Sequence, residues 1–204
     1  MRLIDTHTHL DFPDFDADRA GLLARATARG VTRMVVLGVY QANFQRVWDL
    51  ACADPRLPAA LGLHPVYLEQ HRPADLGHLR GWLERLQGDP RLCAVGEFGL
   101  DYYLPHLDKA QQQHLVESQL QMACDFQRPA LLHVCRRHAQ VIASLKRHRP
   151  ARAGHIHAFA GRSEEARQYP KLGIRRGRGG AGTGPEARRP RRARWQLSPL
   201  TASN

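Results

Sequence analysis

The chain has 204 residues, of which 43% are hydrophobic and 24% are charged. This composition excludes a wholly disordered polymer, a coiled coil and a membrane protein, because no apolar run is long enough to span a bilayer. After Arg2 the chain meets polar residues again at Asp5, which is too early for the apolar core of a secretion signal. The sequence therefore predicts one globular domain without a membrane partner.

The formal net charge of +11 is concentrated near the C-terminus. Residues 171–204 contain nine arginine or lysine residues and the single acid Glu186, a net charge of +8, whereas residues 1–170 carry only +3. The basic segment is also rich in glycine and proline, which disfavours regular structure. We expect residues 1–170 to form the folded domain and residues 171–204 to be a solvated tail or an arm for nucleic acid.

The cysteines are scattered along the chain and form no CxxC pair, which excludes a zinc ribbon. Reduced thiols and a cytoplasmic location are the resulting expectation. The four positions are Cys52, Cys93, Cys124 and Cys135.

Short apolar runs alternate with longer amphipathic stretches, which is typical of repeated βα units around a parallel sheet. The predicted strands lie at residues 2–5, 31–39, 58–63, 92–100, 129–134 and 154–159. The predicted helices lie near 17–29, 43–53, 74–87, 108–126, 137–148 and 163–169, where Pro170 interrupts the last one. Residues 173–180 offer a seventh strand, although Arg175, Arg176 and Arg178 suit a barrel wall poorly.

Six or seven strands are fewer than the eight of a (β/α)₈ barrel, which usually needs about 250 residues. An open doubly wound sheet would suit the length, but no Gly-rich nucleotide loop follows the first strand. The predicted fold is therefore α/β, a TIM-type (β/α)₈ barrel in which the last strand–helix unit or units are missing.

Metal-competent side chains stand at the C-terminal ends of several predicted strands, where barrel enzymes build their sites. His7 and His9 are two residues apart, so both imidazoles can face one metal ion, although such a pair is a weak signal alone. Glu97, His133 and His157 emerge from three later apolar strands. An ionised Glu97 in a buried strand needs a counter-charge, which a divalent cation would supply.

The other polar residues near these strings have less specific interpretations. His64 precedes Pro65 and is either a loop cap or a site residue, and Asp101 either orients a ligand imidazole or caps the next helix, with the cap favoured. Arg136 follows His133 closely enough to meet a phosphate, although a basic first turn of a helix is also an ordinary surface. We expect the histidines in helices and loops to be solvated, namely His71, His78, His106, His114 and His148.

The strings IDTHTHLDF, ALGLHP, VGEFGLDYY, LLHV, HIHAFAG and GRGGAGT have the order and spacing of the TatD-type metal-dependent deoxyribonucleases, and resemble most the YjjV-like branch. The resemblance covers about residues 2–189. It implies a metal-dependent hydrolase barrel with two divalent ions, Mg, Mn or Zn, that hydrolyses phosphodiester bonds of DNA, often from a strand end. Two such ions activate water, so no serine or cysteine nucleophile is required.

The resemblance also implies residue roles. His64 matches a histidine near the substrate phosphate, and Glu97 is the catalytic carboxylate that bridges the two ions. The remaining ligands match in two pairs, His7 with His9 for one ion and His133 with His157 for the other.

The sequence departs from the family pattern toward its end. Family members continue further and supply a metal-binding aspartate in an ETDxP string of the eighth strand, but no aspartate follows Asp125 here. Cys135 also stands where family members usually have an arginine, two residues after the ligand histidine. We expect a chain truncated at its C-terminus, by a premature end or a change of reading frame, and an open barrel with reduced metal occupancy.

Two other functions fit the same residues. One is a metal-dependent ester or amide hydrolase, such as an aminoacyl-tRNA deacylase, because the same ligands serve acyl hydrolysis. The other is an inactive fragment that binds nucleic acid non-specifically through its basic segment.

Overall fold

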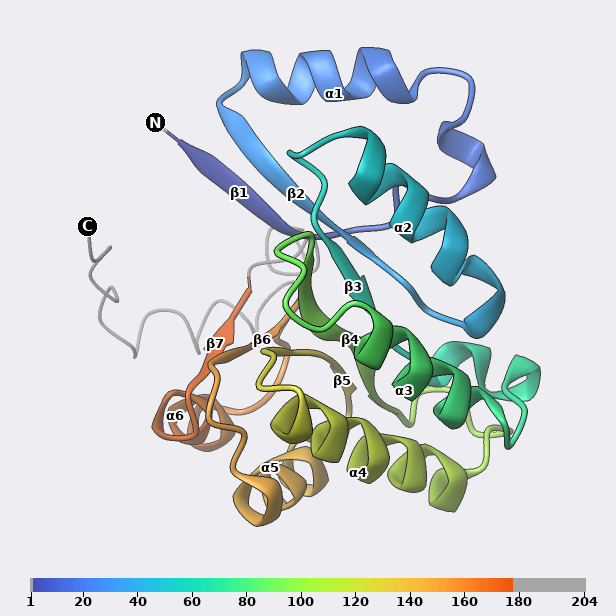
Figure 1. The fold of residues 1–204 in the computed structure, drawn as a ribbon. Helices are drawn as coiled ribbons and strands as arrows, with labels where there is room; N and C mark the ends of the chain where they lie inside the picture. Colours follow the sequence, from blue (N-terminus) through green and yellow to red (C-terminus); the bar gives the residue numbers. More distant parts are fainter. Residues whose placement is uncertain (1, 178–204) are drawn as a thin grey trace.

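Seven parallel strands form the centre of the molecule, whose computed structural model describes residues 2–177 (Figure 1). They pair in chain order, each with the next. Their bounds are β1 (Leu3–Thr8), β2 (Val31–Leu37), β3 (Ala59–Leu61), β4 (Leu92–Asp101), β5 (Ala130–Cys135), β6 (Gly154–Ile156) and β7 (Ile174–Arg176). Within the described residues β1 and β7 do not pair with each other, so the sheet is a curled, open barrel wall.

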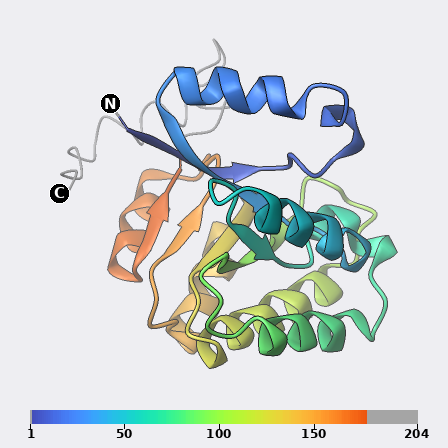
Figure 2. The ribbon, with the colours of Figure 1, turned by 45° about the horizontal axis from the view of Figure 1, so that its top comes forward.

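Helices alternate with the strands and lie along the outside of the curled sheet (Figure 2). They are α1 (Arg19–Ala28), α2 (Phe44–Ala53), α3 (Asp75–Arg85), α4 (Lys109–Asp125), α5 (His138–His148) and α6 (Ser163–Lys171). Three short 3₁₀ segments, η1 (Pro13–Phe15), η2 (Gln41–Asn43) and η3 (Pro65–Gln70), lie in the loops. None of the helices from residue 2 to 177 is long and apolar enough to cross a membrane.

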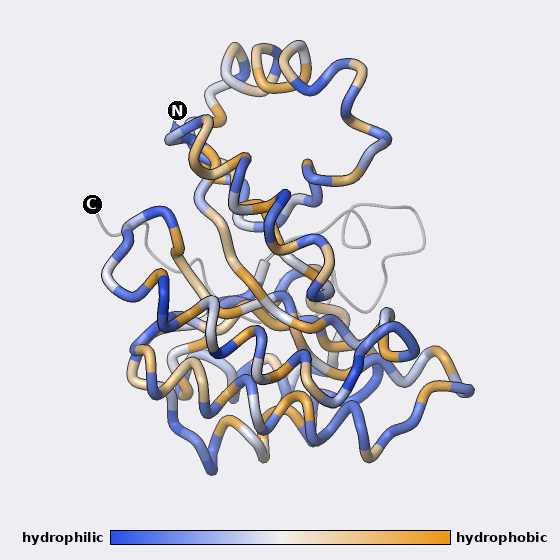
Figure 3. The backbone as a smooth tube through the Cα atoms, turned by 45° about the vertical axis from the view of Figure 1, so that its right-hand side comes forward, coloured by the Kyte–Doolittle hydropathy of each residue, from blue (hydrophilic) through white to orange (hydrophobic). Residues whose placement is uncertain are grey.

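The strands have two apolar faces because alternate side chains point to opposite sides of a sheet. On β2, Met34 and Val36 join the large core shared with the helices, whereas Val35 and Leu37 join a smaller cluster on the inner face of the wall. Hydrophobic segments accordingly run along the central strands, while the helices alternate in hydropathy (Figure 3). A sheet covered on its outer face in this way is what the βα pattern predicts.

The last predicted elements differ from the structure in detail. Helix α6 continues through Pro170 to Lys171, so the predicted interruption is wrong. Pro170 lies in the final turn, where one backbone hydrogen bond is lost, and the fully buried Tyr169 keeps that turn packed.

The predicted seventh strand is present as β7, although it is short. It pairs with β6, and Arg176 places its guanidinium 5.6 Å from the centre of the Phe159 ring instead of inside the wall. Most of the predicted basic segment, residues 178–204, lies outside the described residues.

Candidate metal centre

The centre of the site is Glu97, which lies on β4 and is only 1% exposed. The neighbouring strand approaches it closely because residue 62 is a glycine. A Cβ on Gly62 would lie 2.7 Å from the carbonyl carbon of Gly96 and 2.8 Å from the carbonyl oxygen of Glu97. Any side chain at position 62 would therefore displace the backbone that holds the carboxylate.

Five imidazoles converge on the two oxygens of this carboxylate. The nearest nitrogens of His7, His9 and His64 lie 3.3, 3.7 and 3.5 Å from Oε2. Those of His133 and His157 lie 3.4 and 2.8 Å from Oε1.

The curl of the sheet is what brings these imidazoles together. The His7 and His157 rings stack with centroids 3.9 Å apart, although they belong to β1 and to the end of β6, which are distant in strand order. The structure thus gathers every predicted metal ligand around Glu97, in the C-terminal half of β4.

The charges and the burial in this cluster favour an ionised Glu97 and neutral imidazoles at His7 and His64. Burial by itself would raise the pKa of Glu97, but the surrounding histidines, His64 foremost, hold it well below its usual range. Burial is also the main reason that the pKa of His7 falls to about 3 and that the pKa of His64 is lowered. Deprotonated imidazole is the form that binds a metal ion.

The donor set fits a divalent cation. Neither oxygen of Glu97 has a hydrogen-bond partner within the described residues, and the same is true of Nδ1 of His9. Buried polar atoms rarely stay unpaired, because each loses its hydration without compensation. Two compact groups are close enough to hold an ion, one of His7, His9 and Glu97 and the other of His64, Glu97 and His133.

Asp101 supports the site from the end of β4, so the preferred prediction of a helix cap is wrong. Its Oδ2 lies 2.9 Å from Nε2 of His133, and together with Glu97 it raises the pKa of His133 to about 9, against the opposing effect of burial. The residue that caps α4 is Asp108, whose side chain accepts the Gln111 N–H. The loop between β4 and α4 is long enough to leave Asp101 at the strand end.

His64 and Arg136, the predicted substrate-binding residues, occupy different environments. His64 is buried, and its Nδ1 accepts the N–H of Val66 at 3.1 Å, so it caps η3 and faces Glu97 at the same time. Arg136 is exposed just beyond β5, with its guanidinium 4.6 Å from the centre of the Tyr103 ring. The structure brings His64 into the cluster and leaves Arg136 at the rim.

Two histidines that were expected to be solvated are not. His71 is buried, and its Nε2 lies 2.9 Å from the carbonyl oxygen of His64, which fixes the backbone of that residue. His148 is half-buried and pairs with Glu117 at 2.6 Å. No periodicity or motif marks His71, because its partner is a backbone atom that only the turn of η3 brings close.

A curled parallel sheet that gathers a buried carboxylate and histidines at the C-terminal ends of its strands defines the class of metal-dependent hydrolases with a TIM-type barrel. Within that class the chain belongs to the TatD-related DNase family, whose model matches residues 4–201.

Individual relatives agree with this assignment. The chain is 40% identical over 190 residues to YjjV of Escherichia coli K12, an uncharacterized metal-dependent hydrolase, covering 93% of this chain and 73% of YjjV. It superimposes on the crystal structure of YjjV with a TM-score of 0.91 and 39% identity, covering 96% of this chain and 75% of the other. It is also 30% identical over 174 residues to a Pantoea vagans protein named 3′-5′ ssDNA/RNA exonuclease TatD, covering 84% of this chain and 65% of that protein.

Proposed function

We propose that the protein hydrolyses phosphodiester bonds of single-stranded DNA with two divalent metal ions as cofactors. The observation that carries this proposal is Glu97, a buried ionised carboxylate whose two oxygens have no hydrogen-bond partner among the described residues and are surrounded by five imidazoles. The name of the Pantoea vagans relative supports a nucleic-acid strand as the substrate and attack from one end.

The ligands divide into two sets around the shared carboxylate. His7, His9 and Glu97 would hold one ion, and Glu97, His133 and His157 the other, with Mg, Mn and Zn all compatible with mixed nitrogen and oxygen donors. Bound ions of this kind polarise the scissile phosphate and lower the pKa of a water molecule toward neutrality. Asp101 keeps the His133 ring in place through the 2.9 Å contact with Nε2.

His64 and Arg136 would bind the phosphate itself. The Nδ1 of His64 accepts the Val66 N–H, so the ring proton is on Nε2, which faces the site and can donate to a phosphate oxygen. The Arg136 guanidinium at the rim is suited to a second phosphate of the strand. We place the reaction in the cytoplasm, because all four cysteines are free thiols.

The test is release of nucleotides from an end-labelled single-stranded DNA in Mg or Mn. We expect Glu97→Gln to abolish release, because the neutral amide cannot balance two cations. Glu69→Gln, at an exposed position of η3, is the matched control and should retain full activity. Circular dichroism and a second variant, His9→Ala, separate loss of chemistry from loss of folding.

Two outcomes would contradict the proposal. Equal release by wild type and folded Glu97→Gln would assign the activity to a contaminant. Hydrolysis of an aminoacyl ester but not of DNA, with the same dependence on Glu97, would assign the site to acyl transfer instead.

A further inference from the structure

Two tyrosines form a short row of rings that leads away from the metal centre. The ring centroid of Tyr67, on η3, lies 6.0 Å from that of His64. The Tyr40 ring follows at 5.1 Å from Tyr67, with the two planes inclined by 58°. Both tyrosines are only partly buried, so a planar group arriving from solvent can reach them.

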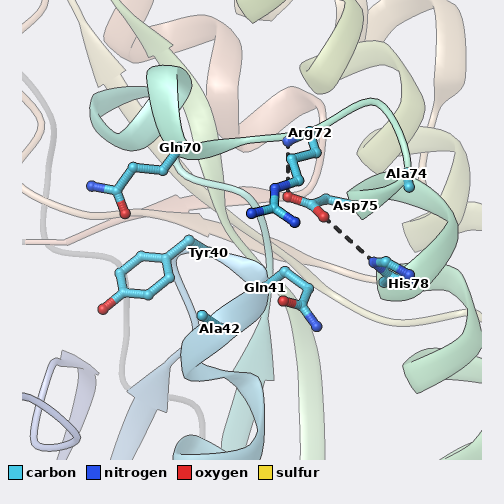
Figure 4. Close-up of a pocket in the computed structure, with 8 residues that line it drawn as sticks. All are labelled: Tyr40, Gln41, Ala42, Gln70, Arg72, Ala74, Asp75 and His78. Carbon is cyan, nitrogen blue, oxygen red and sulfur yellow. Dashed lines mark hydrogen bonds and ion pairs between the residues drawn. The ribbon is translucent and has the colours of Figure 1, made fainter.

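The row ends at a cleft of about 260 Å³ between residues 40–42 and residues 70–78. Arg72 extends its guanidinium into this cleft toward Gln41, and the amide of Gln70 stands near the Tyr40 side (Figure 4). Within residues 2–177 the Arg72 guanidinium has no ion pair or hydrogen bond. The Arg72 backbone N–H donates to Oδ2 of Asp75 at 2.9 Å, and its carbonyl oxygen accepts the Asp75 N–H at 3.0 Å. The cleft therefore presents a cation, two amides and an aromatic ring, together with the Asp75 carboxylate, which lies 3.4 Å from Nδ1 of His78.

The Tyr40 backbone is held firmly in relation to the metal centre. The side-chain oxygen of Asn43 accepts the N–H groups of Val39 and Tyr40 at 3.1 and 3.3 Å, and its amide donates to Asp11 at 2.8 Å. The carbonyl of Val39 accepts the N–H of His64 at 2.8 Å. These bonds join the segment that carries Tyr40 to the segment that carries His64, so the row of rings is organised before any ligand arrives.

We propose that Tyr40 and Tyr67 stack an unpaired base of the substrate and that Arg72 binds the phosphate beside it, which makes this rim a subsite selective for single strands. The inference rests on the proposed function and specifies how that site would recognise its substrate. Stacking on an aromatic ring requires an exposed base face, which a duplex does not offer, and it tolerates every base. The cation supplies the sequence-independent attraction to the backbone.

The first experiment measures binding by the full chain, in Mn, of a phosphorothioate oligonucleotide that contains 2-aminopurine. Tyr40→Leu should weaken binding about tenfold, the effect of one lost base–aromatic stack, and should reduce the quenching of the 2-aminopurine fluorescence. Tyr40→Phe keeps the ring and should bind as wild type. Equal binding by the Leu and Phe variants would overturn the stacking role.

The second experiment separates Arg72 from general electrostatics. Arg72→Ala should weaken binding of the oligonucleotide. It should also reduce the slope of log K against log salt concentration by about one, the value for one lost phosphate contact. Arg152→Ala removes the same charge from the exposed loop before β6, at the opposite end of the strands, and should leave binding nearly unchanged. An equal loss in both variants would overturn the phosphate role.

Kinetics distinguish failure of this subsite from failure of the proposed function. Tyr40→Leu should raise the KM for an oligonucleotide about tenfold relative to that for methyl 4-nitrophenyl phosphate, which has no neighbouring nucleotide. If wild type hydrolyses both substrates and the variant leaves this ratio unchanged, the subsite is wrong. If wild type hydrolyses neither, the proposed function is wrong, and the fluorescence experiment still decides whether Tyr40 stacks a base.

Discussion

At the scale of single residues, the site depends on how each histidine is oriented. Nε2 of His133 lies 2.9 Å from Oδ2 of Asp101, while its Nδ1 faces Oε1 of Glu97 at 3.4 Å. A carboxylate that accepts the second ring N–H of a metal-binding histidine fixes its tautomer and makes it a better ligand. Asp101 would thus act on a bound ion through His133.

Removing this support should weaken metal binding. We expect Asp101→Ala to lower the affinity for Mn or Zn by about 10- to 100-fold in a calorimetric titration, and Asp101→Asn, which keeps an acceptor oxygen, to lower it less. Asp108→Ala removes the cap of α4 and should cost about 1 kcal/mol of stability without changing metal affinity. Equal metal affinities in Asp101→Ala and wild type would contradict the role given to Asp101.

At the scale of elements, helices α4 and α5 are joined by a polar network around Glu117. Its carboxylate accepts the Ser144 hydroxyl at 2.6 Å, contacts Nε2 of His148 at 2.6 Å, and pairs with Arg147. Burial favours the neutral acid, but these donors outweigh it and lower the pKa of Glu117 to about 2. The network therefore stabilises the fold only while Glu117 is ionised.

This pKa predicts a particular acid dependence of stability. Because the folded pKa is below the unfolded value of 4.5, the contribution is present above pH 4.5 and is lost as the pH falls toward 2. We expect Glu117→Gln to reduce the free energy of unfolding by about 1–2 kcal/mol at pH 7. The difference in free energy of unfolding between variant and wild type should become smaller at low pH. Urea denaturation of wild type and variant between pH 3 and 7 measures this difference, with Glu69→Gln as control. A stability difference that does not change with pH would refute the role given to ionised Glu117.

At the scale of the whole molecule, the metal centre joins strands from both sides of the open wall. Ligands from β1 and from the end of β6 meet at one carboxylate, while Leu3 and Ile4 at the start of β1 remain 39% and 60% exposed. An ion bound there would hold the two sides of the curled sheet together. The stability of the fold should therefore be linked to metal binding.

Metal addition should raise the melting temperature. At a free ion concentration of 100 times Kd, metal binding should raise the free energy of unfolding by about 2.7 kcal/mol. This corresponds to an increase in melting temperature of about 5–10 °C for a chain of this size. A chelator should reverse the shift, and Glu97→Gln should show little of it. Differential scanning fluorimetry with Mn or Zn measures the effect; an equal shift in Glu97→Gln would place the ion elsewhere.

The sequence by itself determined the order of strands and helices, the parallel sheet and the positions of the metal-competent residues at strand ends. The reason is that hydrophobic periodicity is local, and parallel strands bring their C-terminal ends to one edge whatever the loops between them do. The HxH pair and the strings around Glu97, His133 and His157 therefore sufficed to predict the family, and the family-model match confirmed it.

Only the tertiary structure decided the contacts between segments distant in sequence. It paired Asp101 with His133, placed His71 against the backbone of His64, and set Tyr40 beside Tyr67. These pairings depend on loop geometry and on the curl of the sheet, which no periodicity encodes. The contacts that support the candidate metal ligands and the rim beside them come from packing, whereas the candidate ligands themselves are proposed from sequence motifs.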